Sequence, residues 1–212
     1  RRYVVKKYRG IFLKHHREIG LIREANRIVA RVLDALGKAV RPGAVTMEFE
    51  DIARSICDEE GVRPAFLGYQ GFPFALCCSV NEEVVHGFPS KERVLKEGDI
   101  VSFDMGVVYK GFFGDSARTF AVGEVDEETT RLLDVTKGSL MAGIEMARPG
   151  NNLFDVSRAV QEHVESHGFG IVRRFVGHGI GAHLHEKPEV PNFVPKGLPG
   201  VKLKAGMVLA IE

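Results

Sequence analysis

Apolar side chains recur every three or four residues in two long stretches of the chain, and this spacing is typical of helices that bury one face. The first stretch contains Ile19, Ile22, Ile28, Val29, Val32, Leu33 and Leu36. The second contains Leu132, Leu133, Val135, Leu140 and Ile144. We therefore predict one long helix near the start of the chain and another near its middle.

A different pattern covers residues 100–121. The apolar residues of its first run include Ile100, Val101, Phe103, Val107 and Val108. Lys110 and Gly111 separate this run from a second one, as in a two-residue hairpin turn. The segment therefore predicts a hairpin whose first strand is buried.

The chain also repeats a set of landmarks. The triplet Arg-Pro-Gly at 41–43 recurs at 148–150, an offset of 107 residues, and each copy precedes a predicted helix. We expect Thr46 to cap the first of these helices. For the second, Asn152 and Asp155 predict a capping box.

Both of these helices are expected to end at a glycine, Gly61 and Gly168. Further on, the run VLKEGDIVSFD, which ends at Asp104, parallels KLKAGMVLAIE, which ends at Glu212. Chance is the alternative explanation, because Arg-Pro-Gly and Lys-x-Gly are common. Four landmarks at nearly one offset favour a true repeat.

The repeat predicts an α+β protein with two pseudo-symmetric halves, about 16–123 and 124–212, whose helices cover a curved antiparallel sheet. We expect residues 16–212 to form a single domain. The run at the start of the chain is locally basic, and residues 1–15 are expected to be a solvated arm.

Two aspartates lie on the predicted hairpin. If its turn is at 110–111, Asp115 lies opposite Gly106, and Asp104 lies two residues away on the same face. The aspartates would then be diagonal neighbours with backbones roughly 7–8 Å apart. Solvent-facing carboxylates are the alternative, but the strand is apolar, and buried like charges are costly without a cation. The pair favours a divalent metal site.

Glu212 is the counterpart of Asp104 in the repeat. The first hairpin returns with a second carboxylate, Asp115, and the second hairpin should do the same. We therefore expect the domain to be incomplete at its carboxyl end, with one more acidic ligand beyond residue 212.

Among the histidines, His178 has the most suggestive surroundings, because it lies in the glycine-rich run GHGIG at 177–181. Glycines allow close approach of the backbone, which suits a ligand imidazole. The run is not a dinucleotide fingerprint. His185-Glu186 lacks the second histidine of H-E-x-x-H, which excludes a zincin. By themselves, His185 and His86 are equally compatible with a site and with structure.

Composition narrows the class of protein further. The chain is 44% hydrophobic and 27% charged, which is ordinary for a globular domain. A net charge of +1 argues against nucleic acid as a partner. No apolar run reaches the roughly 18 residues of a membrane helix. Three cysteines without zinc spacing favour a reducing compartment, so we expect a cytoplasmic protein.

Together these residues resemble type I methionine aminopeptidase, a dinuclear metalloenzyme with the pita-bread fold. The resemblance runs from the first helix to Glu212. The runs that carry it are NEEVVHGFPS, GDIVSFDMG, GFFGDSARTF, GHGIGAHLHEKPEVPNF and GMVLAIE. Their order and number make the resemblance specific, although GHGIG alone would not.

The resemblance implies two divalent metal ions, with cobalt, manganese, iron or zinc as candidates. The metal ligands that it implies are Asp104, Asp115, His178 and Glu212, with a fifth, bridging glutamate beyond the end of the chain. Glu212 would also take part in catalysis.

The resemblance also implies substrate-binding residues. His86 and His185 match histidines that contact the substrate near the scissile amide. Tyr69, Phe72 and Cys77 match a pocket for the methionine side chain. Leu184 departs from the pattern, since the family often has an aromatic residue there.

The implied activity is removal of the initiator methionine from nascent polypeptides near the ribosome, by a monomer with no nucleic-acid or membrane partner. Two alternatives stay open. A related Xaa-Pro peptidase would usually carry a large N-terminal domain and a different histidine region, and neither is seen. A non-catalytic binding module on the same fold would typically lack ligands that are present here.

Overall fold

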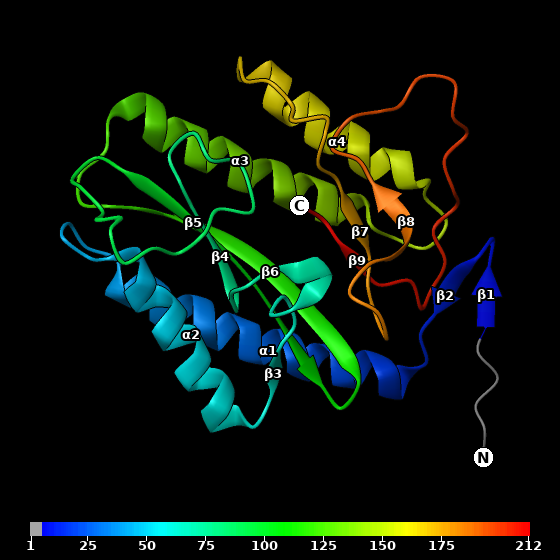
Figure 1. Ribbon diagram of the computed structural model, residues 1–212. Coiled ribbons are helices and arrows are strands. Elements are labelled where there is room, and N and C mark those ends of the chain that lie inside the picture. The colour runs from blue at the N-terminus through cyan, green and yellow to red at the C-terminus, as the bar shows by residue number, and fades with distance from the viewer. Residues whose placement is uncertain (1–5) are drawn as a thin grey trace. The chain divides into compact units, whose positions relative to one another are not determined.

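A computed structural model of the chain describes residues 6–212. The chain divides into two compact units. The first-half unit is Gly20–Glu127, and the second-half unit combines the described part of Arg1–Ile19 with Glu128–Glu212. Each unit contains helices and an antiparallel sheet, as the α+β prediction requires (Figure 1).

Two helices form one layer of the first-half unit. Helix α1 is His16–Ala39 and α2 is Thr46–Glu60. The periodic apolar residues of α1 are buried as predicted, except that Ile19 is half-buried. Both helices contribute to the main hydrophobic core, so this layer is held by burial of their apolar faces.

The sheet of the first-half unit is built around β5, Ile100–Tyr109. Strand β6, Phe112–Ala121, pairs along one edge of β5 over its whole length. Two short strands pair with the other edge of β5, one after the other along its length. They are β4, Leu76–Val80, and β3, Arg63–Pro64. A 3₁₀ turn, η1, covers Tyr69–Gly71 between β3 and β4.

Strands β4 and β5 present an apolar face to the two helices. Side chains alternate between the two faces of a strand, and every second residue of β4 and β5 is buried in the core with α1 and α2. These residues are Leu76, Cys78, Val80, Val101, Phe103, Met105 and Val107. The opposite face is left for polar residues, and the sequence places the aspartates there.

The second-half unit begins with a two-stranded hairpin of β1, Lys6–Tyr8, and β2, Ile11–Leu13. These strands lie within the predicted arm. Lys6 and Lys7 are exposed, whereas Ile11 is buried. Residues 1–5 of the arm lie outside the described residues, and the division into an arm and one domain stays a prediction.

Two helices and a three-stranded sheet complete this unit. Helix α3 is Glu127–Met146 and α4 is Leu153–Ser166. The strands are β7, Gly177–Gly179, β8, Glu186–Val190, and β9, Leu209–Ala210, in the order β8-β7-β9. A small core of Leu153, Val156, Val190 and Leu203 joins α4 to the strands.

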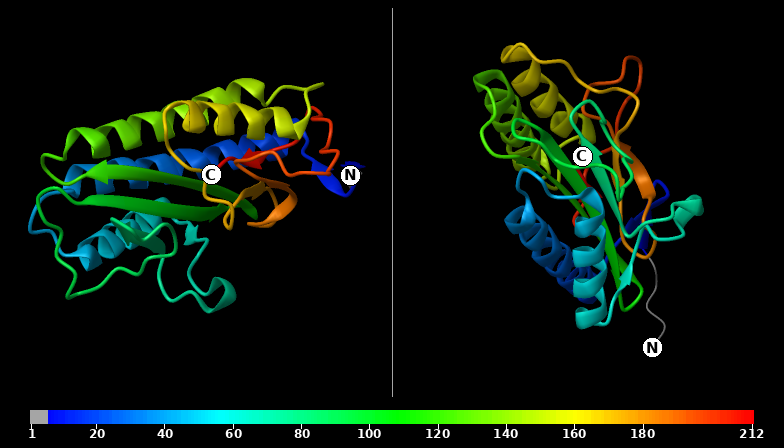
Figure 2. Two further views of the ribbon diagram at one scale, coloured as in Figure 1. Left: turned by 90° about the horizontal axis from the view of Figure 1, so that it is seen from above. Right: turned by 60° about the vertical axis from the view of Figure 1, so that its left-hand side comes forward.

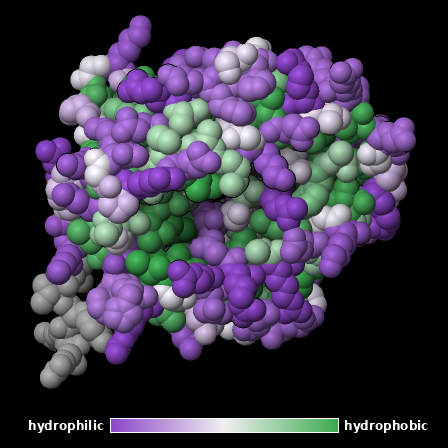
Figure 3. Space-filling model, turned by 180° about the vertical axis from the view of Figure 1, so that it is seen from behind, coloured by the Kyte–Doolittle hydropathy of each residue, from purple (hydrophilic) through white to green (hydrophobic). Residues whose placement is uncertain are grey.

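Helix α3 packs on α4 through small residues, which apolar periodicity does not reveal. A Cβ at Gly143 would lie 2.8 Å from Val160, and one at Gly138 would lie 2.6 Å from His163. The two helices lie side by side in both views of Figure 2. The helix was predicted correctly, but Leu140 and Ile144 are more than a third exposed. On the face drawn in Figure 3, hydrophobic residues likewise reach the surface among hydrophilic ones.

The predicted caps are correct at α4 and wrong at α2. Asn152 Oδ1 accepts a hydrogen bond from Phe154 N (2.9 Å), and Asp155 accepts one from Asn152 N (2.7 Å). The N-cap of α2 is Val45, and Thr46 is its first helical residue. The Thr46 hydroxyl is engaged elsewhere, because it bonds the backbone of a distant segment at Ser90.

Both predicted helix ends coincide with a left-handed glycine. Gly61, with φ of 63°, is the C-cap of α2. Helix α4 ends at Ser166 with His167 as its C-cap, and Gly168 follows with φ of 82°. Glycine adopts this conformation without the steric cost that a Cβ would bring.

The repeat is present in the hydrogen bonds of the two units. Gly43 N donates to Leu95 O (2.8 Å), and Gly150 N donates to Leu203 O (3.0 Å). In each unit an isolated antiparallel bridge stands beside this bond; the pairs are Val45 with Val94 and Asn152 with Lys202. Each Arg-Pro-Gly turn is therefore held by the lysine-containing run that precedes a carboxylate.

Among residues 6–212, no helix is both long and apolar enough to cross a membrane.

Candidate metal centre

The carboxylate hairpin has the register that its turn predicts. Lys110 and Gly111 have φ of 49° and 85°, the left-handed conformations of a tight hairpin turn. Asp115 consequently pairs with Gly106, and Asp104 lies two residues from Gly106 on the same face. Both carboxylates are half-buried on the face opposite the core. The two aspartates are thus diagonal neighbours.

Helix α1 sets the position of Asp115. The Asn26 side chain accepts a hydrogen bond from Asp115 N (3.2 Å) and donates one to Ile22 O (3.0 Å). The helix approaches closely here, because a Cβ at Gly114 would lie 2.7 Å from the backbone of Ala25. A residue larger than glycine would push this strand, and Asp115 with it, away from the helix.

Cys77 is on the same face as the aspartates, since it pairs with Asp104 across β4 and β5. Its neighbour Cys78 faces the core. Burial raises the pKa of the Cys77 thiol, and the negative charges of Asp104 and Asp115 raise it further. Cys77 therefore remains a neutral thiol, suited to an apolar pocket rather than to nucleophilic attack.

A buried carboxylate anchors the segment that leads into β4. Glu50, on α2, is only 3% exposed, and its oxygens accept hydrogen bonds from Ala75 N (2.8 Å) and Leu76 N (3.2 Å). Arg54 Nε lies 2.6 Å from the same carboxylate and supplies the countercharge. This anchor holds the chain that carries Cys77.

His86 lies at the edge of the first-half sheet. Its φ of 61° is unusual for a residue with a side chain. The next residue, Gly87, lies against β4, where its nitrogen donates to Ser79 Oγ (3.0 Å) and a Cβ would meet Cys78 O at 2.3 Å. His86 and Phe88 line an open pocket of about 670 Å³.

Three aromatic rings form a cluster that includes Phe88, two residues after His86. Phe72 is 5.4 Å from Phe88 and Phe74 is 5.5 Å from it, between ring centroids. Edge-on contacts of this kind stabilise aromatic clusters. Phe72 and Tyr69, two of the predicted pocket residues, belong to the segment between β3 and β4.

In the second-half unit, His178 is held between two strands. It lies in β7, is 6% exposed, and pairs with Glu189 of β8 and Ala210 of β9. Its Nδ1 is 2.9 Å from the carbonyl oxygen of Gly179. A carbonyl can only accept, so Nδ1 carries a proton and Nε2 is the nitrogen available to a ligand.

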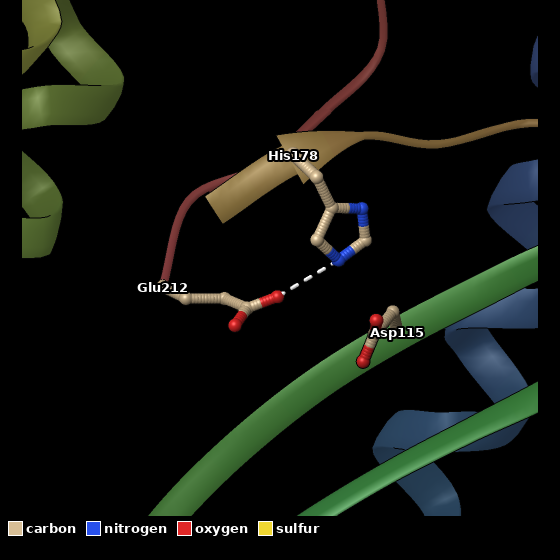
Figure 4. A group of neighbouring side chains, drawn as sticks. All are labelled: Asp115, His178 and Glu212. Carbon is tan, nitrogen blue, oxygen red and sulfur yellow. Dashed lines mark ion pairs between the residues drawn. The ribbon is translucent and has the colours of Figure 1, made fainter. Parts of the chain in front are cut away.

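Glu212 provides the partner of that nitrogen. Glu212 Oε1 lies 2.9 Å from His178 Nε2 (Figure 4). In the neutral imidazole both atoms are acceptors, so this approach requires either a proton on Nε2 or a cation near both. Nitrogen and carboxylate donors of this kind fit a divalent transition metal. Figure 4 also labels Asp115, which belongs to the first-half unit.

The backbone of Glu212 is held as well, because Asn192 Nδ2 donates to its carbonyl oxygen. Its counterpart in the repeat, Asp104, lies within β5, whereas β9 ends at Ala210, two residues before Glu212. The reason is that β9 pairs with β7 only at His178 and Gly179.

His185 is the third predicted residue of this unit. Its ring centroid is 4.3 Å from that of His178, with 58° between the ring planes. His185 is exposed, whereas Leu184 beside it is buried. The structure thus brings His178, His185 and Glu212 together, and in the first-half unit it brings Asp104 and Asp115 together beside Cys77.

Sequence reasoning missed the residues that hold these groups in place. Asn26, Glu50 and the Lys14–Glu186 ion pair were not singled out. The signal for the first two was a polar residue among apolar ones at helical spacing. Asn26 lies between Ile22 and Val29, and Glu50 lies between Met47 and Ala53. No local signal links Lys14 to Glu186.

Comparison with known proteins shows the family. The model of metallopeptidase family M24 matches residues 20–212, and the chain belongs to this family. The chain is 50% identical over 202 residues to a methionine aminopeptidase of Clostridium acetobutylicum, covering 95% of this chain and 80% of that relative. It is 47% identical to methionine aminopeptidase 1 of Bacillus subtilis, covering 95% and 81%.

Solved structures agree with the predicted pita-bread fold. Methionine aminopeptidase from Thermotoga maritima superposes with a TM-score of 0.92 at 48% identity, covering 95% of this chain and 80% of that one. A prolidase from Pyrococcus furiosus has a TM-score of 0.81 at 24% identity, covering 96% and 57%. At 24% identity, the similarity to the prolidase shows a common fold alone.

Proposed function

We propose that this chain removes the N-terminal methionine of peptides and nascent proteins. The observation that carries the proposal is its 50% identity, along 95% of its length, to a protein named methionine aminopeptidase. The alternatives are weaker. The chain is only 24% identical to the Pyrococcus furiosus prolidase, and a non-catalytic module would not need the four ligand residues that this chain carries.

The metal-binding residues in this proposal are Asp104, Asp115, His178 and Glu212. Three carboxylates and a neutral imidazole suit two divalent ions, with cobalt, manganese, iron or zinc as candidates. The close approach of His178 Nε2 to Glu212 Oε1 supports a cation there. When bound, such ions would lower the pKa of water so that hydroxide is available near neutral pH, and they would stabilise developing negative charge.

Other residues of the chain would act on the substrate directly. We assign His86 and His185 to the peptide bond after methionine, where an imidazole can donate a hydrogen bond to the carbonyl or contact the amide. Glu212 would pass a proton to the leaving amine. The exposure of His86 and His185 leaves them accessible to a peptide.

The methionine side chain would bind a pocket that includes Tyr69, Phe72 and Cys77. A thioether prefers apolar, polarisable surroundings. Cys77 suits this role because burial raises its pKa and keeps the thiol neutral. Leu184 is a further apolar residue, buried beside His185.

The cellular setting is part of the same proposal. Nascent polypeptides are the substrates, which places the protein in the cytoplasm near the ribosome. We propose that it acts as a monomer.

The test uses the complete gene product that carries this chain, freed of metal and reloaded with cobalt or manganese. Met-Ala-Ser should be cleaved, and Leu-Ala-Ser and Ala-Pro-Ser should be cleaved far more slowly. Asp104→Asn should abolish cleavage, whereas Asp134→Asn, an exposed residue of α3, should leave it unchanged. Faster cleavage of Ala-Pro-Ser would favour an Xaa-Pro peptidase, and no cleavage of any peptide would favour the binding module.

A further inference from the structure

Lys14 and Glu186 form a buried ion pair in the second-half unit. Lys14 Nζ is 2.5 Å from Glu186 Oε2, and the two side chains are 4% and 3% exposed. Removing two charges from water is costly, so a buried pair is weak evidence of a stabilising contact. Lys14 follows β2, and Glu186 is the first residue of β8, 172 positions later.

Lys14 is held at its backbone, and its side chain passes close to a glycine. Its backbone nitrogen donates to Gly206 O (2.7 Å), which fixes the residue at its base. Its side chain then passes over Gly181, where a Cβ would lie 2.3 Å from Lys14 Cε. A methyl group at position 181 would therefore require the Lys14 side chain to shift.

Glu186 uses its two oxygens for two different tasks. Oε2 contacts Lys14, and Oε1 accepts a hydrogen bond from the backbone nitrogen of His183 (3.1 Å). One carboxylate therefore ties the turn at 181–185 to the N-terminal segment. His185 is the last residue of that turn and stands next to Glu186 in the chain.

The His185 ring, at the end of this turn, lies beside His178 of β7. Strand β8 pairs with β7 through Glu186 and Gly179, just after an irregularity in register at His178. The ring of His185 is 4.3 Å from that of His178, between centroids. A shift of Glu186 would move both the turn and the edge of β7.

We propose that Lys14 and Glu186 are a positioning pair that holds the turn at 181–185, and with it the His185 ring, against His178. This role rests on the proposed function only in so far as His185 meets the substrate. Neither Lys14 nor Glu186 takes part in the chemistry. The positive charge of Lys14 allows the Glu186 carboxylate to be buried where it can accept a hydrogen bond from His183 N.

The experiment compares Lys14→Met/Glu186→Leu with Lys14→Arg, using Lys202→Met, an exposed lysine of the same unit, as the control. An apolar pair can replace a buried ion pair without loss of stability, but leucine cannot accept the bond from His183 N. In histidine-labelled protein, the nuclear Overhauser effect between the His178 and His185 rings should disappear in the double variant. Its kcat for Met-Ala-Ser should fall about 10- to 100-fold with little change in KM. Lys14→Arg and Lys202→Met should preserve both readouts.

A folded double variant with the ring contact and kcat unchanged would overturn the proposal. If the double variant does not fold, Gly181→Ala tests the same link, because its methyl group displaces the Lys14 side chain. Unaltered ring contact and kcat in that variant would also overturn it. If the unsubstituted protein cleaves no methionine peptide, the proposed function fails, while the ring contact still tests the positioning role.

Discussion

His178 Nε2 lies 2.9 Å from Glu212 Oε1, and the other ring nitrogen of His178 lies 2.9 Å from the Gly179 carbonyl oxygen. The carbonyl contact orients the imidazole so that its second nitrogen points at the carboxylate. Such second contacts commonly fix the tautomer of a metal-binding histidine. The strands thus prepare a nitrogen and an oxygen donor before any ion binds.

Glu212→Gln should weaken metal binding. The amide removes one negative donor beside His178 and leaves the fold of β7 intact, so we expect the Kd for cobalt to rise by at least about 10-fold. Titration calorimetry on the metal-free gene product measures this change. Glu162→Gln, at an exposed position of α4, is the matched control. An unchanged Kd for Glu212→Gln would remove Glu212 from the ligand set.

Asp104→Asn should have opposite effects with and without metal. Without metal, in the presence of a chelator, loss of one of the two neighbouring carboxylates relieves repulsion across the hairpin. The free energy of unfolding should therefore rise by about 0.2–1 kcal/mol. With cobalt present, the substituted protein should gain less stability than the parent. Thermal unfolding in both conditions checks the sign, with Asp134→Asn as control. Destabilisation in chelator would indicate that Asp104 has a structural partner that outweighs the repulsion.

Glu50→Ala should destabilise the first-half unit. Two backbone nitrogens at the start of β4 would lose their buried acceptor, and Arg54 would lose its countercharge. We expect the free energy of unfolding to fall by at least about 2 kcal/mol, because each buried nitrogen left without an acceptor costs about 1–3 kcal/mol. Urea denaturation measures it, and Asp51→Ala, the exposed neighbour on α2, should change it by less than about 0.5 kcal/mol. A loss as small as that of Asp51→Ala would contradict the anchoring role.

The cysteines should resist alkylation in the folded protein. Burial raises the pKa of Cys57 to about 11 and that of Cys78 to about 12, and it also raises the pKa of Cys77. A raised pKa reduces the reactive thiolate at any pH below it, and two pH units correspond to about a 100-fold reduction. Iodoacetamide labelling at pH 8, read by mass spectrometry, should be at least about 100-fold slower than in urea. Rapid labelling of Cys77 in the native chain would mean that its thiol is activated.

Local patterns predicted the parts of the fold that depend on neighbours in sequence. The spacing of apolar residues located α1, and the turn at Lys110 and Gly111 defined the register that pairs Asp115 with Gly106. A hairpin register follows from its turn, so no distant contact was needed.

The same patterns failed where a distant segment competes for a side chain. Thr46 was expected to cap α2, but its hydroxyl bonds the backbone at Ser90. Leu140 and Ile144 were expected on a buried face, but α3 turns its glycines toward α4 instead. Tertiary contacts decide such cases, because one hydrogen bond or one close approach outweighs a local preference.

By itself, the sequence determined the family, the repeat and the identity of the candidate ligands, because motifs and periodicity are properties of residue order. Only the tertiary structure decided that His178 offers Nε2 to Glu212, and that Lys14 meets Glu186 across 172 residues. Those relationships depend on strand pairing and burial, which orient side chains in ways that no local pattern records.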